Sequence, residues 1–259
     1  MMKATGFDLL RQALRVLGPR RESGKFDLVL GPCAVESEEQ INACAEAVSK
    51  CGATYLRGGA IKLRTQVDTF HGIGREAWRM LRAAADAHGL KAVSEVTRPE
   101  DIEYASRSLD ALQIGARSMW HFDLLEAAAK SGRPVVLKRG LGSSTTDWLA
   151  AAVRLKSYGC DDVILCERGD RAADVGPRNA IDISTLIFLA SEGPLPLWLD
   201  VSHSAGDPAV ALRLLQLAPS LGVAGVMAET HPNPADALCD ADQAIPLILL
   251  QNQTRDEDG

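Results

Sequence analysis

Eight short runs of apolar and β-branched residues alternate with longer helical patterns from Phe26 onward. The runs cover residues 26–30, 54–56, 92–96, 111–114, 134–137, 162–166, 195–199 and 225–228. Helical periodicity fills the intervals at residues 38–51, 74–87, 99–107, 121–130, 145–157, 183–190 and 207–217, and resumes from Pro234. Such alternation indicates repeated βα units around a parallel sheet.

Eight βα units in about 230 residues match the length and order of an α/β fold of the (β/α)8 TIM-barrel type. A doubly wound open sheet is the alternative, but it normally has fewer strands and a glycine-rich phosphate turn after the first strand. The sequence therefore predicts a single barrel rather than an open sheet.

The predicted barrel has a short segment on either side. Apolar residues at helical spacing over residues 7–17, ended by Gly18-Pro19, predict an amphipathic N-terminal helix. We expect it to serve as a packing element or an oligomer contact. The predicted organisation is a helical extension at residues 1–25, a catalytic barrel at 26–250 and a polar tail at 251–259.

Charge and cysteine content exclude several classes of protein. The net charge is −6 and no basic stripe occurs, so nucleic-acid binding is not expected. The six cysteines form no C-x-x-C pair, and no signal-peptide pattern precedes them, which favours a reducing cytoplasm. No apolar run reaches the roughly 18 residues of a membrane helix, so no membrane partner is expected.

Four potential metal ligands occur where strands of the barrel should end, or shortly after. They are Cys33, His203, Glu229 and Asp240. One thiolate, one imidazole and two carboxylates form a mixed N/S/O set that suits a divalent metal. The alternative is that Cys33 is a small buried apolar side chain, which is the more frequent role of a lone cysteine. Spacing alone leaves both interpretations open.

Basic residues also follow the apolar runs, at the barrel end where TIM-barrel active sites form. Guanidinium groups bind phosphate and carboxylate in bidentate fashion, and lysine supplies a point charge. A solvated surface role is the alternative for each residue. Six cations suit two anionic substrates, or one that carries both a carboxylate and a phosphate. They are Arg57, Lys62, Arg64, Arg117, Lys138 and Arg168.

Three acidic residues at strand ends are candidates for proton transfer. Glu95 and Glu167 could act as general acid or base groups, or could form structural ion pairs with nearby cations. Asp200 is the stronger candidate, because it lies three residues before His203 and could bind a substrate hydroxyl or a water.

Six segments carry a resemblance to a known family. The chain resembles the short form of the metal-dependent 3-deoxy-D-arabino-heptulosonate 7-phosphate (DAHP) synthases and, more distantly, the 3-deoxy-D-manno-octulosonate 8-phosphate synthases. The similarity runs from about Phe26 to Leu247. Its segments are Gly31-Pro32-Cys33-Ala34-Val35-Glu36-Ser37, Leu56-Arg57-Gly58-Gly59-Ala60, Leu112-Gln113-Ile114-Gly115-Ala116-Arg117, Leu137-Lys138-Arg139-Gly140, Ile164-Leu165-Cys166-Glu167-Arg168-Gly169 and Glu229-Thr230-His231-Pro232-Asn233-Pro234.

The resemblance implies that phosphoenolpyruvate (PEP) condenses with an aldose phosphate, normally erythrose 4-phosphate, to give a 3-deoxy-2-keto sugar acid phosphate and inorganic phosphate. This is the first step of the shikimate pathway to aromatic amino acids. It implies one divalent metal ion (Mn, Co, Zn or Fe) on Cys33, His203, Glu229 and Asp240. It places PEP on Arg57, Lys62, Ala116, Arg117, Lys138 and Arg168.

The resemblance also implies catalytic roles for four residues. Lys138 is a possible proton donor and Glu95 a possible water-positioning group, while Asp200 and His203 complete the set. For the aldose phosphate it implies Arg64, Thr65, Arg178, Asn179 and Asp200.

The chain departs from the family on the aldose side. It has Lys62-Leu63-Arg64-Thr65-Gln66 where the family usually has Lys-Pro-Arg-Thr-Ser, and Val201 where a proline is common. These changes leave the accepted aldehyde open. The alternatives are octulosonate phosphate synthesis with arabinose 5-phosphate, a specialised relative that uses another sugar phosphate, a Schiff-base aldolase acting through Lys138, and a non-catalytic PEP-binding homologue.

Relatives commonly form homodimers or homotetramers, and the same is expected here. Some relatives sense aromatic products through an additional ferredoxin-like or chorismate mutase domain. The sequence contains neither, so we expect no strong inhibition by phenylalanine, tyrosine or tryptophan; a sub-millimolar inhibition constant would contradict this.

Overall fold

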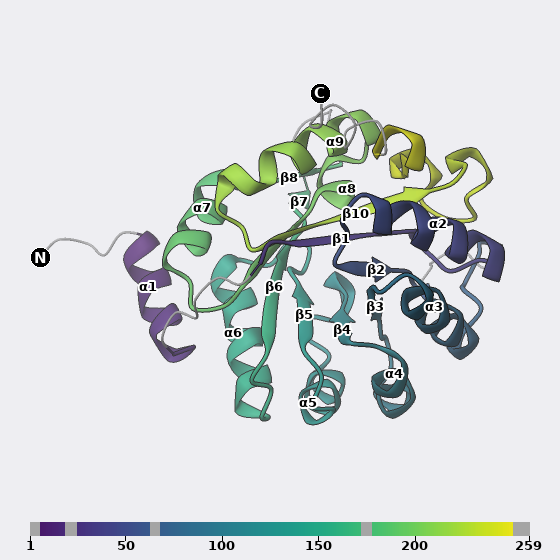
Figure 1. Ribbon diagram of the computed structural model, residues 1–259. Helices are drawn as coiled ribbons and strands as arrows, with labels where there is room; N and C mark the ends of the chain where they lie inside the picture. The colour runs from purple at the N-terminus through teal and green to yellow at the C-terminus, as the bar shows by residue number, and fades with distance from the viewer. Residues whose placement is uncertain (1–5, 19–24, 63–67, 172–177, 251–259) are drawn as a thin grey trace, which may run out of the picture.

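Parallel strands form a closed barrel at the centre of the protein, with helices around it (Figure 1). A computed structural model of the chain describes residues 6–18, 25–62, 68–171 and 178–250. The barrel strands are β1 (Asp27–Gly31), β2 (Tyr55–Arg57), β3 (Lys91–Glu95), β4 (Ala111–Ile114), β5 (Val135–Lys138), β6 (Val163–Glu167), β9 (Leu197–Asp200) and β10 (Gly225–His231).

Closure of the barrel follows from the pairing of its first and last strands. Each strand pairs in parallel with the next in the order β1-β2-β3-β4-β5-β6-β9-β10, and β10 pairs back onto β1 with Asp27 opposite Gly225 and Gly31 opposite Glu229. The predicted (β/α)8 TIM barrel is therefore confirmed, and the open sheet is excluded. All carboxyl ends of the strands lie at one mouth.

The helices between the strands begin at polar capping residues. Ser37, Ser144 and Asp182 accept hydrogen bonds from the first turns of α2, α6 and α7, which satisfies free backbone donors there. The helices are α2 (Glu38–Lys50), α3 (Arg75–Ala87), α4 (Ile102–Ser108, after the 3-10 turn η1, Pro99–Asp101), α5 (Phe122–Lys130), α6 (Thr145–Ser157), α7 (Ile183–Glu192) and α9 (Pro208–Leu217).

The N-terminal helix α1 (Gly6–Val16) lies against the outside of the barrel beside α6 (Figure 1). Leu10 and Leu14 are buried. The Arg11 guanidinium also forms an ion pair with Glu192 of α7, with an Nε–Oε2 distance of 2.8 Å. The helix predicted from the apolar spacing is thus present, and its apolar face packs on the barrel helices.

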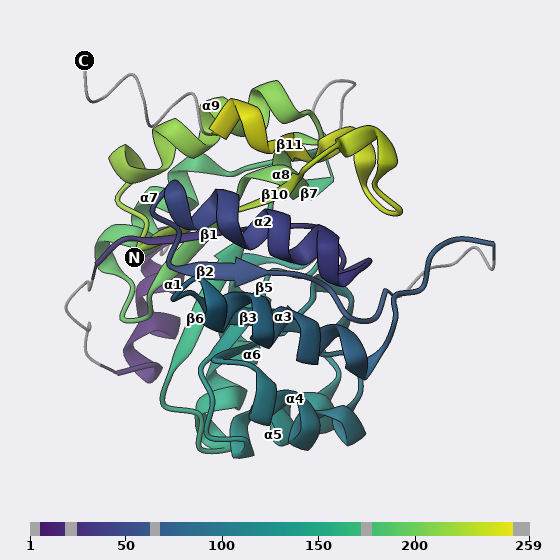
Figure 2. The same cartoon turned by 45° about the vertical axis from the view of Figure 1, so that its right-hand side comes forward.

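The segment after β10 differs from the expectation. The helix predicted from Pro234 is wrong: the chain forms the 3-10 turns η4 (Pro234–Asp236) and η5 (Ala241–Gln243), and then β11 (Ile245–Pro246). β11 pairs in parallel with the end of β10, which holds the segment over the barrel mouth (Figure 2). Asp240 adopts φ 50°, a left-handed conformation that interrupts any continuous helix.

Two further elements at the mouth were not predicted from the sequence. A short helix α8 (Val201–Ala205) begins directly after β9, and a hairpin forms from β7 (Asp170–Arg171) and β8 (Asn179–Ala180). Both place polar residues close to the strand ends, as described below.

The interior of the barrel is filled by side chains, so it is a core rather than a channel. Inward-facing residues such as Tyr55, Val93, Trp198 and Met227 form one buried cluster. A larger apolar cluster lies between the strands and the helices. Among the residues that the structure describes, no helix has the length and apolar character needed to cross a bilayer. Polar groups therefore concentrate at the mouth.

Candidate active site

A cavity of about 320 Å³ opens at the carboxyl ends of the strands. It is lined by most of the residues that the sequence predicted: Arg57, Lys62, Glu95, Ala116, Arg117, Lys138, Arg168, Arg178, Asn179, His203 and Asp240. Cys33, Asp200 and Glu229 are buried close to these residues. The predicted Arg64 and Thr65 lie outside the described residues. The structure thus brings the described candidates to a single site.

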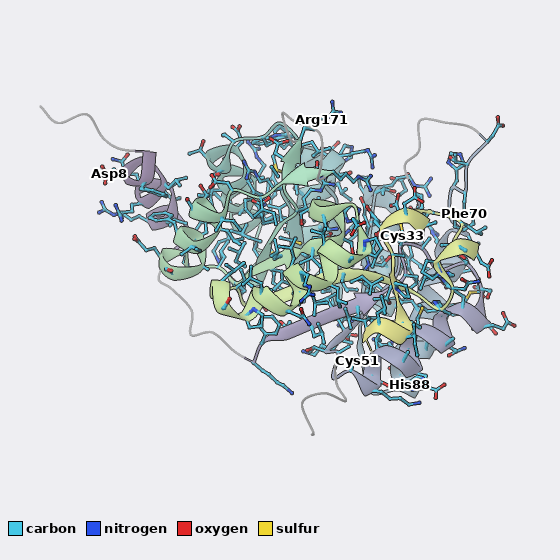
Figure 3. The ribbon with its side chains drawn as sticks, turned by 90° about the horizontal axis from the view of Figure 1, so that it is seen from above. Asp8, Cys33, Cys51, Phe70, His88 and Arg171 are labelled. Atoms are coloured by element: carbon cyan, nitrogen blue, oxygen red, sulfur yellow. The ribbon has the colours of Figure 1, made fainter. Side chains whose placement is uncertain are left out.

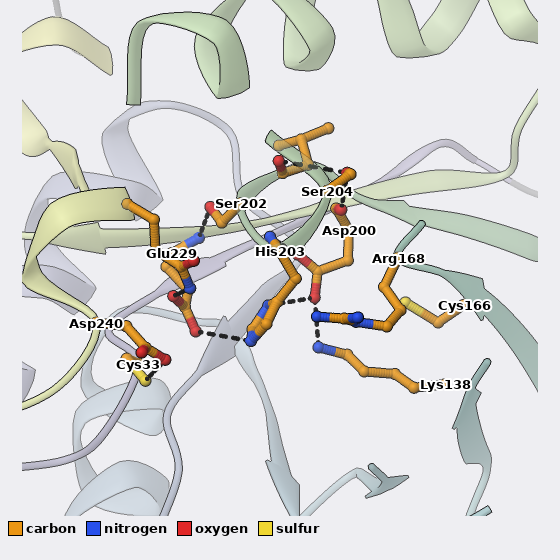
Figure 4. A network of polar contacts seen from close by, with 12 residues as sticks. Cys33, Lys138, Cys166, Arg168, Asp200, Ser202, His203, Ser204, Glu229 and Asp240 are labelled. Atoms are coloured by element: carbon orange, nitrogen blue, oxygen red, sulfur yellow. Dashed lines mark hydrogen bonds and ion pairs between the residues drawn. The ribbon is translucent and has the colours of Figure 1, made fainter. Parts of the chain in front are cut away.

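The four predicted metal ligands are neighbours, with Cys33 next to Asp240 and His203 next to Glu229 (Figure 4). Ligand atoms of Cys33, Glu229 and Asp240 lie within 4.8 Å of one another. The Cys33 Sγ is 3.1 Å from Asp240 Oδ2. His203 Nε2 is 3.8 Å from Glu229 Oε1. Figure 3 shows Cys33 beside the yellow C-terminal segment, far from Asp8 of α1.

The electrostatics of this cluster fit a divalent cation. Burial opposes ionisation of Asp240, but the hydrogen bond from Cys33 and the charges of Lys62, His203 and Arg178 lower its pKa to about 2. Burial likewise opposes ionisation of Glu229, yet nearby positive charges lower its pKa. Two ionised carboxylates next to a thiol and an imidazole are a donor set that divalent transition metals bind.

The surroundings of Cys33 oppose ionisation of its thiol. Its contact with Cys239, its burial and the charge of Glu229 raise the pKa of the thiol well above its ordinary value. Metals bind the thiolate, so binding at this site would release the Cys33 proton.

Arg57 is a buried cation with unused donors. Its side chain ends β2 and is 6% exposed. Nη2 contacts Glu229 Oε1 at 3.1 Å, while Nε and Nη1 have no hydrogen-bond partner among the described residues. Buried polar groups are nearly always paired, so two unpaired guanidinium nitrogens in a residue that lines the cavity indicate the place of an anion.

Two other cations, the half-buried Lys62 and the buried Arg168, line the same cavity. Burial opposes the charge of Lys62, but Cys33, Cys239 and Glu229 raise its pKa. Burial lowers the pKa of the Arg168 guanidinium. Both side chains line the cavity. A partly desolvated cluster of this kind gains from binding a dianion, because the anion supplies the charge compensation that water cannot.

Lys138, Asp200 and His203 form a linked polar chain (Figure 4). The Lys138 ammonium at the end of β5 is ion-paired with the buried Asp200 carboxylate. The same carboxylate oxygen contacts His203 Nδ1 at 2.9 Å, and the other accepts from the His203 backbone N–H at 3.1 Å. Burial opposes ionisation of Asp200, but His203 and Lys138 hold its pKa well below the usual range.

Glu95 and Glu167 have different surroundings. Glu95 lines the cavity, and a Cβ at position 115 would lie 1.8 Å from its Oε1, so Gly115 leaves the space that this carboxylate occupies. Glu167 instead forms a structural ion pair with Arg139, at 3.0 Å. Its carboxylate also accepts hydrogen bonds from the backbone N–H groups of Arg168 and Gly169, at 2.9 and 2.8 Å. It thereby orients the loop that carries Arg168.

Arg178 and Asn179, which the resemblance assigns to the aldose phosphate, lie at the start of β8. Asn179 is buried, and its Nδ2 donates to the His203 backbone oxygen at 2.6 Å. The Arg178 Nη1 donates to Gln243 Oε1 and lies 3.9 Å from Asp240 Oδ1. Asn179 thus connects the hairpin to the helix that carries His203.

Several of the described residues at the site escaped the sequence prediction. Arg171 and Leu141 line the cavity, Cys239 contacts Cys33, and Gln243 donates to the Glu229 carboxylate. Cys239 adjoins the predicted ligand Asp240, which is a usable signal. No such signal points to Gln243, because the segment that forms its turn is predicted as a helix.

Fold and site together define a (β/α)8 barrel whose mouth holds a cation-lined cavity beside three groups that could hold a metal ion. The comparisons agree: the model of the DAHP synthetase I family matches residues 22–256. The chain belongs to this family, and it is an enzyme of the DAHP synthase type.

Named relatives come from two branches. The chain is 36% identical over 229 residues to a phospho-2-dehydro-3-deoxyheptonate aldolase of Thermotoga maritima, with 88% of this chain and 68% of the relative covered. It is 31% identical over 249 residues to a 2-dehydro-3-deoxyphosphooctonate aldolase of Acidithiobacillus ferrooxidans, with 89% and 87% covered.

Solved structures agree with the barrel. The Thermotoga maritima DAHP synthase superposes with a TM-score of 0.85 at 35% identity, covering 90% of this chain and 69% of that one. A truncated form of the 3-deoxy-D-arabino-heptulosonate 7-phosphate synthase from Thermotoga maritima gives 0.82 at 34% identity, with 91% and 86% covered.

Proposed function

We propose that this enzyme condenses PEP with an aldose phosphate, erythrose 4-phosphate being the first choice, in a metal-dependent reaction. The product is a 3-deoxy-2-keto sugar acid phosphate, and inorganic phosphate is released. The observation that carries the proposal is the buried Arg57, whose free N–H groups lie next to the Cys33, Glu229 and Asp240 cluster. An anion and a cation site share one wall of the cavity.

PEP carries a carboxylate and a phosphate, and the cavity offers cations for both. Arg57 and Arg168 are buried and Lys62 is half-buried, and they surround the cavity together with Arg117 and the Ala116 backbone. These groups would bind the two anionic ends and hold the enol double bond in one orientation. Negative charge that develops on the adduct is stabilised by the same fixed cations.

The four proposed ligands would hold one divalent ion, of Mn, Co, Zn or Fe. When bound, the ion supplies Lewis-acid polarisation of the aldehyde oxygen. In the proposed reaction, C3 of PEP forms a bond to the aldehyde carbon, and water adds at C2. The bond between C2 and the phosphate oxygen then breaks, which releases inorganic phosphate and leaves the 2-keto group.

Proton transfer would involve the chain of Lys138, Asp200 and His203. The Lys138 ammonium is fixed by Asp200, so its N–H points at a defined place in the cavity and can give a proton to the developing oxygen. Glu95 lines the same cavity and would position the attacking water. The ion pair between Lys138 and Asp200 also disfavours the Schiff-base alternative, which needs a neutral, unpaired lysine amine.

The aldose phosphate would bind to Arg178 and Asn179 and, as the family resemblance implies, to Arg64 and Thr65. A second candidate reaction uses arabinose 5-phosphate, as favoured by the 31% identity to a 2-dehydro-3-deoxyphosphooctonate aldolase. The sequence departures from the family at Leu63, Gln66 and Val201 leave the acceptor open, so a panel of aldose phosphates is needed rather than a single assay.

The direct test is release of inorganic phosphate from PEP in the presence of erythrose 4-phosphate. We expect turnover that EDTA abolishes and that added Mn²⁺, Co²⁺ or Zn²⁺ restores. A panel with arabinose 5-phosphate and other aldose phosphates ranks the acceptors by kcat/KM. PEP binding without phosphate release for any acceptor would support the non-catalytic homologue, and turnover insensitive to EDTA would refute the metal requirement.

In this role the enzyme would supply the first step of the shikimate pathway in the cytoplasm, as a homodimer or homotetramer. Leu10 and Leu14 of α1 pack against the barrel, whereas Phe7 and Val16 of the same helix are exposed.

A further inference from the structure

Gln243 is a buried amide at the junction of two parts of the site. It is 2% exposed and lies at the end of η5, three residues after the proposed ligand Asp240. A buried glutamine costs free energy unless its amide is paired, so its position in a polar site calls for a specific set of partners.

The fold explains why the side chain reaches the site. β11 begins two residues later, and Ile245 pairs with Thr230, the residue after Glu229. Asp240 precedes the turn η5 and Gln243 ends it, and both side chains lie near Arg178. The left-handed Asp240 backbone starts this turn at the required angle.

Both ends of the Gln243 amide are used. Its Nε2 donates to Glu229 Oε2, and its Oε1 accepts from Arg178 Nη1. A carboxylate needs a donor and a guanidinium needs an acceptor, and a neutral amide provides both at once. A glutamate at this position would repel Glu229, and a lysine would repel Arg178.

The bridge fixes the orientation of a proposed metal ligand. With Oε2 held by Gln243, the other Glu229 oxygen faces Arg57 at 3.1 Å and His203 at 3.8 Å. Partners of this kind, which contact a ligand rather than the metal, commonly change metal affinity by about 10- to 100-fold when removed.

The other end of the bridge controls an anion-binding group. The Arg178 side chain is 44% exposed and lines the cavity, so its direction depends on the few groups that hold it. Gln243 is its closest described hydrogen-bond partner, whereas Asp240 lies 3.9 Å away.

We propose that Gln243 is a positioning residue that couples the metal ligand Glu229 to the aldose-phosphate residue Arg178. The proposal rests on the function proposed above. Metal binding fixes Glu229, which fixes Gln243 and so presents Arg178 to the phosphate. Because such coupling is reciprocal, an aldose phosphate on Arg178 also strengthens metal binding. Gln243 thereby links the cation to the substrate whose aldehyde lies beside it.

The test compares the full-length wild type with Q243M, which keeps the side-chain length and removes both hydrogen bonds. The control is Q12L, which replaces an exposed glutamine of α1. Mn²⁺ affinity is measured by calorimetry, with and without erythrose 4-phosphate. We expect Q243M to bind Mn²⁺ about tenfold more weakly, and to lose the tightening by erythrose 4-phosphate that the wild type and Q12L show.

Steady-state kinetics supply the second readout. Q243M should raise KM for the aldose phosphate and leave KM for PEP within twofold, a split that a general loss of structure would not produce. In an R178M background, Q243M should add nothing further to KM for the aldose phosphate. If circular dichroism shows that Q243M does not fold, Q243N, whose amide is one methylene shorter, replaces it with the same expected directions.

Wild-type Mn²⁺ affinity and unchanged KM for the aldose phosphate in the folded variant would overturn the proposal. The Mn²⁺ titration requires no turnover. If the wild type fails to condense PEP with any aldose phosphate, the proposed function fails, while the calorimetry still decides whether Gln243 positions the metal ligand.

Discussion

The Cys33 sulfur donates to Asp240 Oδ2 at 3.1 Å, although 207 residues separate the two along the chain. Cys33 follows the first barrel strand and Asp240 follows the last, and these strands pair directly. Among the described residues, Asp240 is the one non-glycine residue with positive φ, at 50°. Such a conformation costs free energy and persists at functional sites, which agrees with a ligand held in place for a metal.

The first prediction concerns these two residues. D240N and C33S each replace an anionic donor with a neutral one, so each should weaken Mn²⁺ or Zn²⁺ binding by at least about 100-fold, as loss of a direct ligand should exceed the effect of a supporting contact. D242N is the matched control, because Asp242 lies on the same turn and is exposed. Calorimetry and metal content after dialysis measure the effect. Equal metal retention in D240N and D242N would reject Asp240 as a ligand.

The second prediction concerns Lys138. K138M removes the ammonium that pairs with Asp200, so kcat for PEP condensation should fall by about 10²- to 10⁴-fold, the usual contribution of a positioned acid. K130M, at an exposed lysine of α5, should keep wild-type kcat. Borohydride trapping of the wild type with the aldehyde substrate should give no adduct. A stable reduced adduct at Lys138 would instead favour the Schiff-base aldolase.

The site residues that could be predicted from the sequence are those whose positions follow from closure of the barrel. Cys33, His203 and Glu229 lie at or just after the ends of three barrel strands, and any closed barrel in this order brings those ends together. The apolar runs were sufficient to place them. The same argument placed Arg57 and Lys138 at the mouth.

The unpredicted part depends on irregular backbone. Gln243 reaches Glu229 only because Asp240 is left-handed and β11 adds to β10, and neither feature has a periodic pattern. The sequence left open whether Glu167 is a proton-transfer group or a structural ion pair. Its hydrogen bonds from backbone N–H groups favour the structural role, and residue spacing cannot reveal such bonds. Pairing of Lys138 with Asp200 likewise depends on side-chain geometry across the barrel.

The third prediction tests the close approach of Gly115 to Glu95. The Cβ of G115A would lie 1.8 Å from Glu95 Oε1, so the carboxylate must move away from the cavity. We expect kcat to fall at least about tenfold, as the loss of one positioned polar group commonly costs more than this. The double variant G115A/E95A should then be no less active than E95A alone. A further large loss in the double variant would show that Gly115 matters for another reason.

The last prediction concerns stability at high pH. Cys44 is fully buried in α2, and burial, with a smaller contribution from Glu36, raises the pKa of its thiol to about 12. An unfolded cysteine has a pKa of about 8.5. Above that pH the unfolded chain loses a proton that the folded protein keeps, so the unfolded state is favoured and stability falls as pH rises.

The size of the effect is about 1 kcal/mol per pH unit for one thiol between these two pKa values. Urea unfolding with a reductant, at pH 8.5 and 10.5, measures it. C44A loses the titrating group, so its free energy of unfolding should fall less steeply with pH than that of the wild type, whatever its stability at pH 8.5. Identical slopes for the two proteins would mean that the Cys44 thiol ionises equally in both states, against its burial in the helix–barrel core.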